Sequence, residues 1–75
     1  MGVDIRLKTG LIIQRGNAYL VGRIVGSTEY RWSDSPWDAW ITRNRHDAER
    51  IAKKVGGDLM LFNPVAGQVR GLANG

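Results

Sequence analysis

The sequence predicts a small α+β domain: an antiparallel three-stranded meander, one helix packed on one face of it, and a further strand after the helix. Three observations carry this prediction. Short apolar runs between residues 11 and 32 are separated by glycine-containing pairs, a helical stripe begins near residue 44, and an apolar run follows Gly56 and Gly57. We expect residues 1–70 to form one domain and residues 71–75 a flexible C-terminal tail.

The meander is predicted from two turn pairs, Gly16-Asn17 and Gly26-Ser27. Such pairs supply positive φ at low energetic cost, and they join antiparallel strands in tight hairpins. Counting outward from both turns gives the expected cross-strand neighbours. These are Ile13 opposite Leu20, Ile12 opposite Val21, Ile24 opposite Glu29, and Arg23 opposite Tyr30.

Strict alternation divides the meander into two faces, and both are largely apolar. The aliphatic face carries Leu11, Ile13, Leu20 and Ile24. The aromatic face carries Ile12, Tyr19, Val21, Arg23, Val25, Tyr30 and Trp32. Residues 1–9 before the meander are expected to be a lead-in that extends the first strand through Ile5 and Leu7.

The segment from Ser33 to Trp40 is predicted to be a structured loop. Ser35 is placed to cap a short helical turn, and Pro36 occupies the first position of that turn. A brief extended piece is expected over residues 40–42 before the helix begins.

The helix is predicted to start after Asn44, a favourable N-cap, with Asp47 placing negative charge near the positive end of the helix dipole. Its apolar stripe consists of Ala48, Ile51, Ala52 and Val55. A left-handed stop is expected at Gly56-Gly57. Because the alanines are small, the helix is expected to lie close against the aliphatic face.

Two strands are predicted after the helix. Residues 58–62 form a short apolar run bounded by turn residues, which is typical of a strand. Residues 65–70 are expected to form a turn and a weak final strand.

Composition limits the kind of protein this is. The 75 residues include no cysteine, and 11 Lys and Arg stand against 7 Asp and Glu, for a formal net charge of +4. Without cysteine, neither disulfides nor thiolate metal sites support the small core, so oligomerisation is the remaining support. Residues 1–9 lack the apolar core of a signal peptide, and no run has membrane-spanning length. We therefore expect a cytoplasmic protein that does not enter membranes.

The sequence predicts no enzyme, no metal site and no cofactor. His46 is the single histidine, and it falls in the first, polar turn of the predicted helix. The hydroxyl and carboxyl groups between residues 33 and 38 are explained by turn and capping roles, because a nucleophile needs a base and an orienting group beside it. No glycine pair has the order of a phosphate-binding loop.

The leading functional prediction is a protein-interaction module. A helix of about three turns is roughly 17 Å long, enough to shield one sheet face but not both. The aromatic face is then left exposed, and Tyr19, Arg23, Tyr30 and Trp32 are predicted to bind a protein partner or a second copy. In the alternative, the loop from Ser33 to Trp40 folds back over this face, which is then simply core.

A basic nucleic-acid or nucleotide binder is the rival prediction. In that case Tyr19, Tyr30 and Trp32 stack on bases. The phosphates are held by Arg23, Arg31, Arg43 and Arg45. A net positive charge permits such a partner without establishing it.

Several positions together resemble small, mostly uncharacterised α+β proteins encoded by phages and prophages of bacteria. The positions are Trp32-Ser33-Asp34-Ser35, Asp38-Ala39-Trp40, residues 48–52, and Gly56-Gly57 before an apolar strand. The resemblance spans residues 19–70 and implies a compact domain with no assigned reaction. Because some small phage proteins act by binding host enzymes or signals, it favours an interaction role by analogy.

Overall fold

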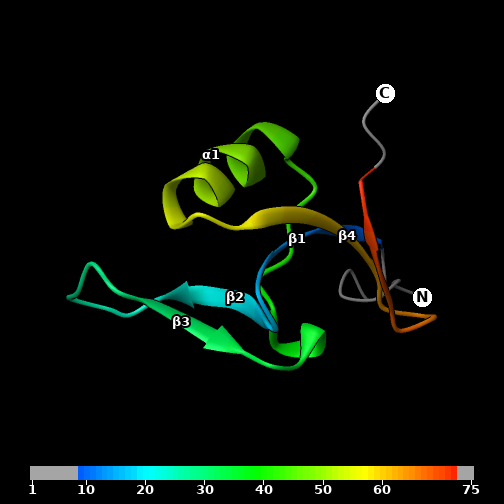
Figure 1. Cartoon of the computed structure of the whole chain (residues 1–75), viewed down its shortest axis with the longest axis horizontal. Coiled ribbons are helices and arrows are strands. Elements are labelled where there is room, and N and C mark those ends of the chain that lie inside the picture. The colour runs from blue at the N-terminus through cyan, green and yellow to red at the C-terminus, as the bar shows by residue number, and fades with distance from the viewer. Residues whose placement is uncertain (1–8, 73–75) are drawn as a thin grey trace, which may run out of the picture.

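A computed structural model describes residues 9–72 as a five-stranded antiparallel sheet with one α-helix, which confirms the α+β class (Figure 1). The sheet strands are β1 (Gly10–Arg15), β2 (Ala18–Arg23), β3 (Tyr30–Ser33), β4 (Asp58–Asn63) and β5 (Gln68–Gly71). The helical elements are the 3-10 turn η2 (Pro36–Asp38) and the helix α1 (Arg45–Val55). The expected lead-in through Ile5 and Leu7 lies outside the described residues.

The strand order is β3-β2-β1-β4-β5, so the predicted meander forms one half of the sheet and the chain after the helix forms the other half. The strand β1 lies at the centre and pairs with β4 from Gly10 opposite Phe62 to Gln14 opposite Asp58. Its run from Leu11 to Ile13 is buried on both faces, as a central strand requires. The weak final strand is present as β5, which extends to Gly71, the first residue assigned to the tail.

The first hairpin has the predicted turn. Arg15 pairs with Ala18 across Gly16-Asn17, and Gly16 has a φ of 61°. Further from the turn, the extended piece after η2 bridges the two strands. The Trp40 backbone N–H donates to the Leu20 carbonyl at 2.8 Å, and Leu11 and Thr42 exchange two backbone hydrogen bonds.

Next to its turn the second hairpin has the predicted register, since the Ile24 backbone N–H donates to the Glu29 carbonyl at 2.9 Å; the register departs from the prediction further along β2. Arg23 lies opposite Tyr30 as expected, but the turn is centred on residues 25 and 26, one residue earlier than predicted, with Gly26 at a φ of 77°. Between residues 20 and 22 an irregularity adds one residue to β2, so that Leu20 pairs with Trp32. A β-bulge of this kind moves the side chains beyond it to the other face.

This bulge corrects the predicted division of faces. Trp32 and Tyr30 pack against the buried cluster of Ile13, Leu20, Ala52 and Val55, on the side of the sheet that faces α1. They therefore do not lie on a face opposite the helix.

The helix has the predicted ends and the predicted buried stripe. The Asn44 side chain accepts a hydrogen bond from the Asp47 backbone N–H at 3.1 Å, and Gly56 ends the helix with a φ of 72°. Ala48, Ala52 and Val55 are buried, while Ile51 is half-buried at the edge of the cluster. The helix packs against β1 and β4.

The face of the sheet away from α1, here called the second face, is covered at its centre. Ile12 is 0 % exposed, which overturns its expected place in an exposed patch. The loop after β3 folds back so that the Trp37 ring meets the Phe62 ring edge to face, with centroids 5.2 Å apart. The alternative prediction, in which this loop covers part of the second face, is thus the better description of the fold.

Candidate functional site

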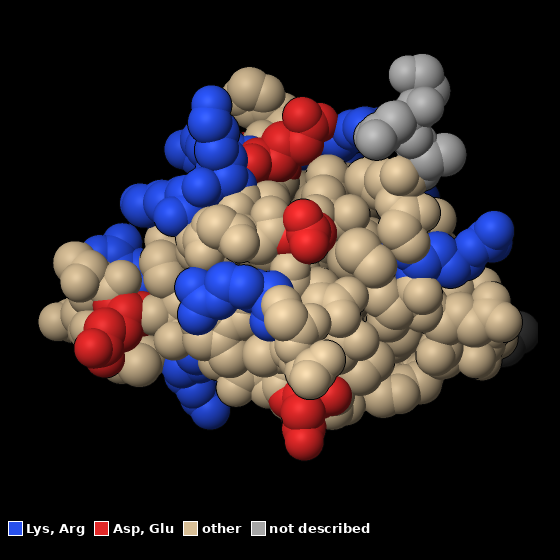
Figure 2. All heavy atoms as spheres, viewed as in Figure 1, with Lys and Arg blue, Asp and Glu red and all other residues tan. Residues whose placement is uncertain are grey.

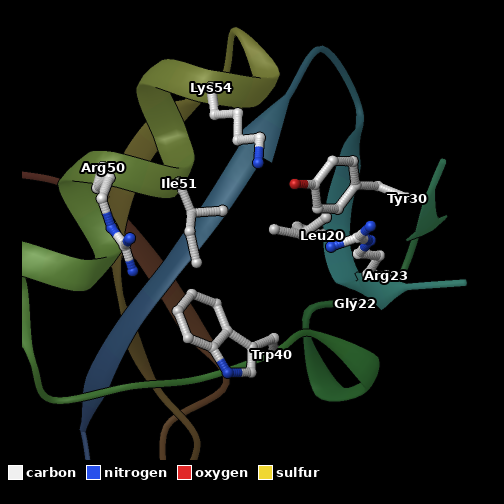
Figure 3. Close-up of a pocket in the computed structure, with 8 residues that line it drawn as sticks. All are labelled: Leu20, Gly22, Arg23, Tyr30, Trp40, Arg50, Ile51 and Lys54. Atoms are coloured by element: carbon white, nitrogen blue, oxygen red, sulfur yellow. The ribbon is translucent and has the colours of Figure 1, made fainter. Parts of the chain in front are cut away.

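A groove opens between α1 and the β2–β3 hairpin, and we call it the basic groove (Figure 3). Its volume is about 570 Å³. Its walls come from β2, β3, α1 and the segment before α1, so it exists only in the folded domain. The lining residues are Leu20, Gly22, Arg23, Tyr30, Trp40, Arg50, Ile51 and Lys54.

The floor of the basic groove is apolar. Leu20 is 2 % exposed and lies at its base, with half-buried Ile51, Tyr30 and Trp40 around it. In Figure 3 the rings of Tyr30 and Trp40 stand on different sides of the space, with Leu20 beside Tyr30 and Ile51 above Trp40. An apolar group that entered the groove would be removed from water and would pack against both aliphatic and aromatic surface.

Gly22 contributes backbone to the lining of the groove. It lies in β2 beside the bulge, and a Cβ built on it meets no atom within 4 Å. A larger side chain at this position would therefore occupy free space rather than clash with the fold. Because Gly22 pairs with Arg31, which lies outside the lining, a side chain at this position would point to the face of the sheet away from Leu20 and Tyr30.

The rim of the basic groove is cationic. Arg50 and Lys54 come from successive turns of α1, and Arg23 comes from the end of β2. Arg50 also lies 3.5 Å from an Asp47 carboxylate oxygen, whereas the Arg23 Nε donates to the Ser27 carbonyl at 2.8 Å. None of the described residues that line the groove is acidic. The rim therefore favours an anionic ligand.

Two of the four predicted partner-binding residues, Arg23 and Tyr30, line this groove. Trp32 does not, because its ring packs in the cluster and the Arg15 guanidinium lies over it at 4.1 Å from the ring centroid. Tyr19 pairs with Ser33 and Gln14 in the sheet and is half-buried outside the groove lining.

The four arginines predicted to hold phosphates are dispersed. Only Arg23 lines the basic groove. Arg31 and Arg43 are exposed elsewhere, and the Arg45 Nε lies 2.9 Å from a Glu49 carboxylate oxygen on the surface of α1. Figure 2 shows Lys and Arg side chains on the viewed face in separate groups, with acidic side chains between them.

Sequence reasoning missed Arg50, Lys54, Ile51 and Trp40 as groove residues. The signal was present in part, because Arg50 and Lys54 are four residues apart and so share a helix face with Ile51. What it lacked was the bulge, which turns the aromatic side of the hairpin toward that helix face.

The residues considered for chemistry have structural roles or are exposed. The Ser33 hydroxyl donates to an Asp38 carboxylate oxygen at 3.0 Å and accepts from the Ser35 backbone N–H, while Ser35 caps η2. His46 is exposed in the first turn of α1. Within residues 9–72 there is no cluster of three or more His, Cys, Asp or Glu suited to a metal ion. In the same range no helix has the length and apolarity to cross a membrane.

Comparisons with protein-family models, with curated proteins and with solved structures each gave no match.

Proposed function

We propose that this protein is a non-catalytic protein-interaction domain and that the basic groove is its docking surface. The resemblance to small phage and prophage proteins supports such a role and a phage or mobile-element origin. Arg23 and Tyr30, which the sequence predicts as binding residues, belong to this surface, whereas Tyr19 and Trp32 do not. The further residues of the surface are Trp40, Arg50, Ile51 and Lys54.

The observation that carries the proposal is the combination of an apolar floor with a rim of three cations. Leu20, Ile51 and the two aromatic rings offer apolar contact area, and Tyr and Trp are enriched among residues that dominate binding energy. Arg23, Arg50 and Lys54 select an acidic partner and steer its approach. Specific interfaces commonly combine such an apolar centre with a polar rim.

The tip of the β2–β3 hairpin extends the surface. Ile24 is 38 % exposed and Val25 is 97 % exposed, directly after the groove residue Arg23. In Figure 1 this hairpin projects beyond the body of the domain. Burial of these adjacent aliphatic side chains under the apolar surface of another protein would lower the free energy of the complex.

Nucleic-acid binding remains the second candidate. The observation in its favour is that two aromatic rings, Tyr30 and Trp40, line the same groove as three cations. Aromatic platforms beside basic residues bind single-stranded nucleic acid by stacking and by phosphate contacts.

The docking surface is tested by capture of partners from the cells that produce the protein. The bait is the whole chain, compared with Lys54→Glu and Arg23→Glu, each of which reverses one rim charge. Lys53→Glu is the matched control, because Lys53 is exposed and does not line the groove, and the substitution changes the net charge equally.

We expect a protein that is retained by the parent chain and by Lys53→Glu and lost with both groove variants. Circular dichroism establishes that each variant is folded. Equal retention of the same protein by all four baits would show that the basic groove is not the docking surface.

A further inference from the structure

The proposed function leaves open what part of a partner enters the basic groove. The groove has a volume of about 570 Å³, within the range of sites that take small molecules or a few side chains. This space suits a short segment rather than a whole helix or domain. The ligand must also match an apolar floor and a cationic rim.

We infer that the basic groove binds an acidic peptide segment of a partner protein, in which one large apolar side chain is flanked by carboxylates. The inference rests on the proposed function and specifies its partner. The apolar side chain packs against Ile51, between the rings of Tyr30 and Trp40 (Figure 3). Leu20 lies beneath it at the base of the groove.

The arrangement of the rim explains why carboxylates are expected on both sides of the anchor. Arg50 and Lys54 lie four residues apart on α1, about 6 Å along the helix axis. Arg23 belongs to the hairpin on the other side of the groove, and in Figure 3 its side chain lies beside Tyr30. A carboxylate that precedes the apolar residue and one that follows it can thus each meet a cation.

A peptide accounts for the surface around the groove better than a nucleic acid does. A phosphate backbone needs cations along its path, whereas Arg31, Arg43 and Arg45 do not line the groove. Val25 and Ile24, exposed beside the groove, gain from contact with apolar protein surface, and phosphates offer them none.

A second copy of the chain is a poor occupant for electrostatic reasons. In a symmetric dimer built on this groove, Arg23, Arg50 and Lys54 of both copies would lie in one interface. Like charges brought together in this way oppose association. The partner is therefore a different, acidic protein.

The test is a titration of the isotope-labelled 75-residue protein with unlabelled peptides, followed by NMR. The probe has the sequence GEDFDEG with blocked ends. One control, GEDADEG, lacks the apolar anchor, and a second, GQNFNQG, lacks the carboxylates. The resonances observed are the Trp40 indole N–H, the Ile51 methyl groups and the Tyr30 ring, because all three side chains line the groove.

We expect the probe to shift these resonances and added salt to weaken its binding. Removal of the anchor should weaken binding about tenfold or more, as the loss of a buried large apolar side chain implies. Lys54→Glu should lose the shifts and Lys53→Glu should keep them. The dispersion of the amide spectrum reports whether each variant is folded.

Three outcomes would overturn the inference: no shift with the probe, equal shifts with the uncharged peptide, or tighter binding of a short oligothymidylate at the same resonances. The test is separable from that of the proposed function. Partner capture that depends on Lys54 without peptide binding refutes only the peptide inference. Peptide binding in the groove, with partner capture that is indifferent to Lys54→Glu, refutes the proposed docking role and leaves the peptide site in place.

Discussion

The guanidinium of Arg15 lies over the ring of Trp32, with its central carbon 4.1 Å from the ring centroid. The same guanidinium donates a hydrogen bond to the Val55 carbonyl at 3.0 Å, at the last residue of α1. One side chain from the first hairpin thereby joins the β2–β3 hairpin to the end of the helix. A cation at this place also suits the negative end of the helix dipole.

We predict that Arg15→Gln destabilises the domain. The change removes a cation–π contact and a hydrogen bond from a charged donor, together about 1–2 kcal/mol at this partly exposed site. For a domain of this size the melting temperature should fall by about 5 °C or more. Thermal unfolding followed by circular dichroism measures it. Arg43→Gln, at an exposed arginine, is the control, and an equal effect of both changes would mean that the Trp32 contact contributes nothing specific.

We predict that Gly16→Val and Gly26→Val each destabilise the domain by roughly 1–2 kcal/mol. Both glycines have positive φ, 61° and 77°, which a residue with a β-carbon adopts at that cost. Gly22→Val is the control, because Gly22 lies in a strand without positive φ and has free space around it. Denaturant midpoints provide the measurement. If both turn variants unfold at the parent's midpoint, these turns do not require the left-handed conformation.

We predict that Trp37→Ala destabilises the domain although Trp37 is 59 % exposed. Its ring covers an edge of Phe62, which is only 3 % exposed, and such aromatic pairs contribute about 0.5–1.5 kcal/mol beyond the area they bury. Trp37→Phe should recover most of the loss. Val65→Ala, at a residue 76 % exposed, should change the melting temperature little, so a parallel effect at both sites would argue against the contact with Phe62.

The local elements of this fold could be predicted because their signals are local. The first turn, the ends of α1 and the strand after it follow from glycines, an N-cap and short apolar runs, and the structure confirms each of them. The side-chain oxygen of Asn44 can accept a hydrogen bond from the first helical turn, and Gly56 can adopt the left-handed conformation that ends a helix. Residue type alone therefore predicts both roles.

The division of sheet faces could not be predicted because one added residue in β2 reverses it. A bulge is set by how a strand fits its neighbours and by the bridge that residues 40–42 make between β1 and β2, neither of which is visible in periodicity. Gly22 was the one local indication, since glycine within a strand often marks a bulge. Hence alternation alone places Tyr30 on the wrong face of the sheet and does not indicate that it lies opposite Arg50 and Lys54 of α1.

The central place of β1 has a consequence for how the chain folds. Its ladder with β4 joins Gly10 to Phe62, so the middle of the sheet is completed by residues far apart in the sequence. Contacts of high sequence separation slow folding, because a long loop must close before they form. A chain emerging from the ribosome can form the hairpins of β1, β2 and β3 early, but Leu11 to Ile13 keep an open edge until β4 has been synthesised. Assembly of the core is therefore delayed until β4 is available to pair with β1.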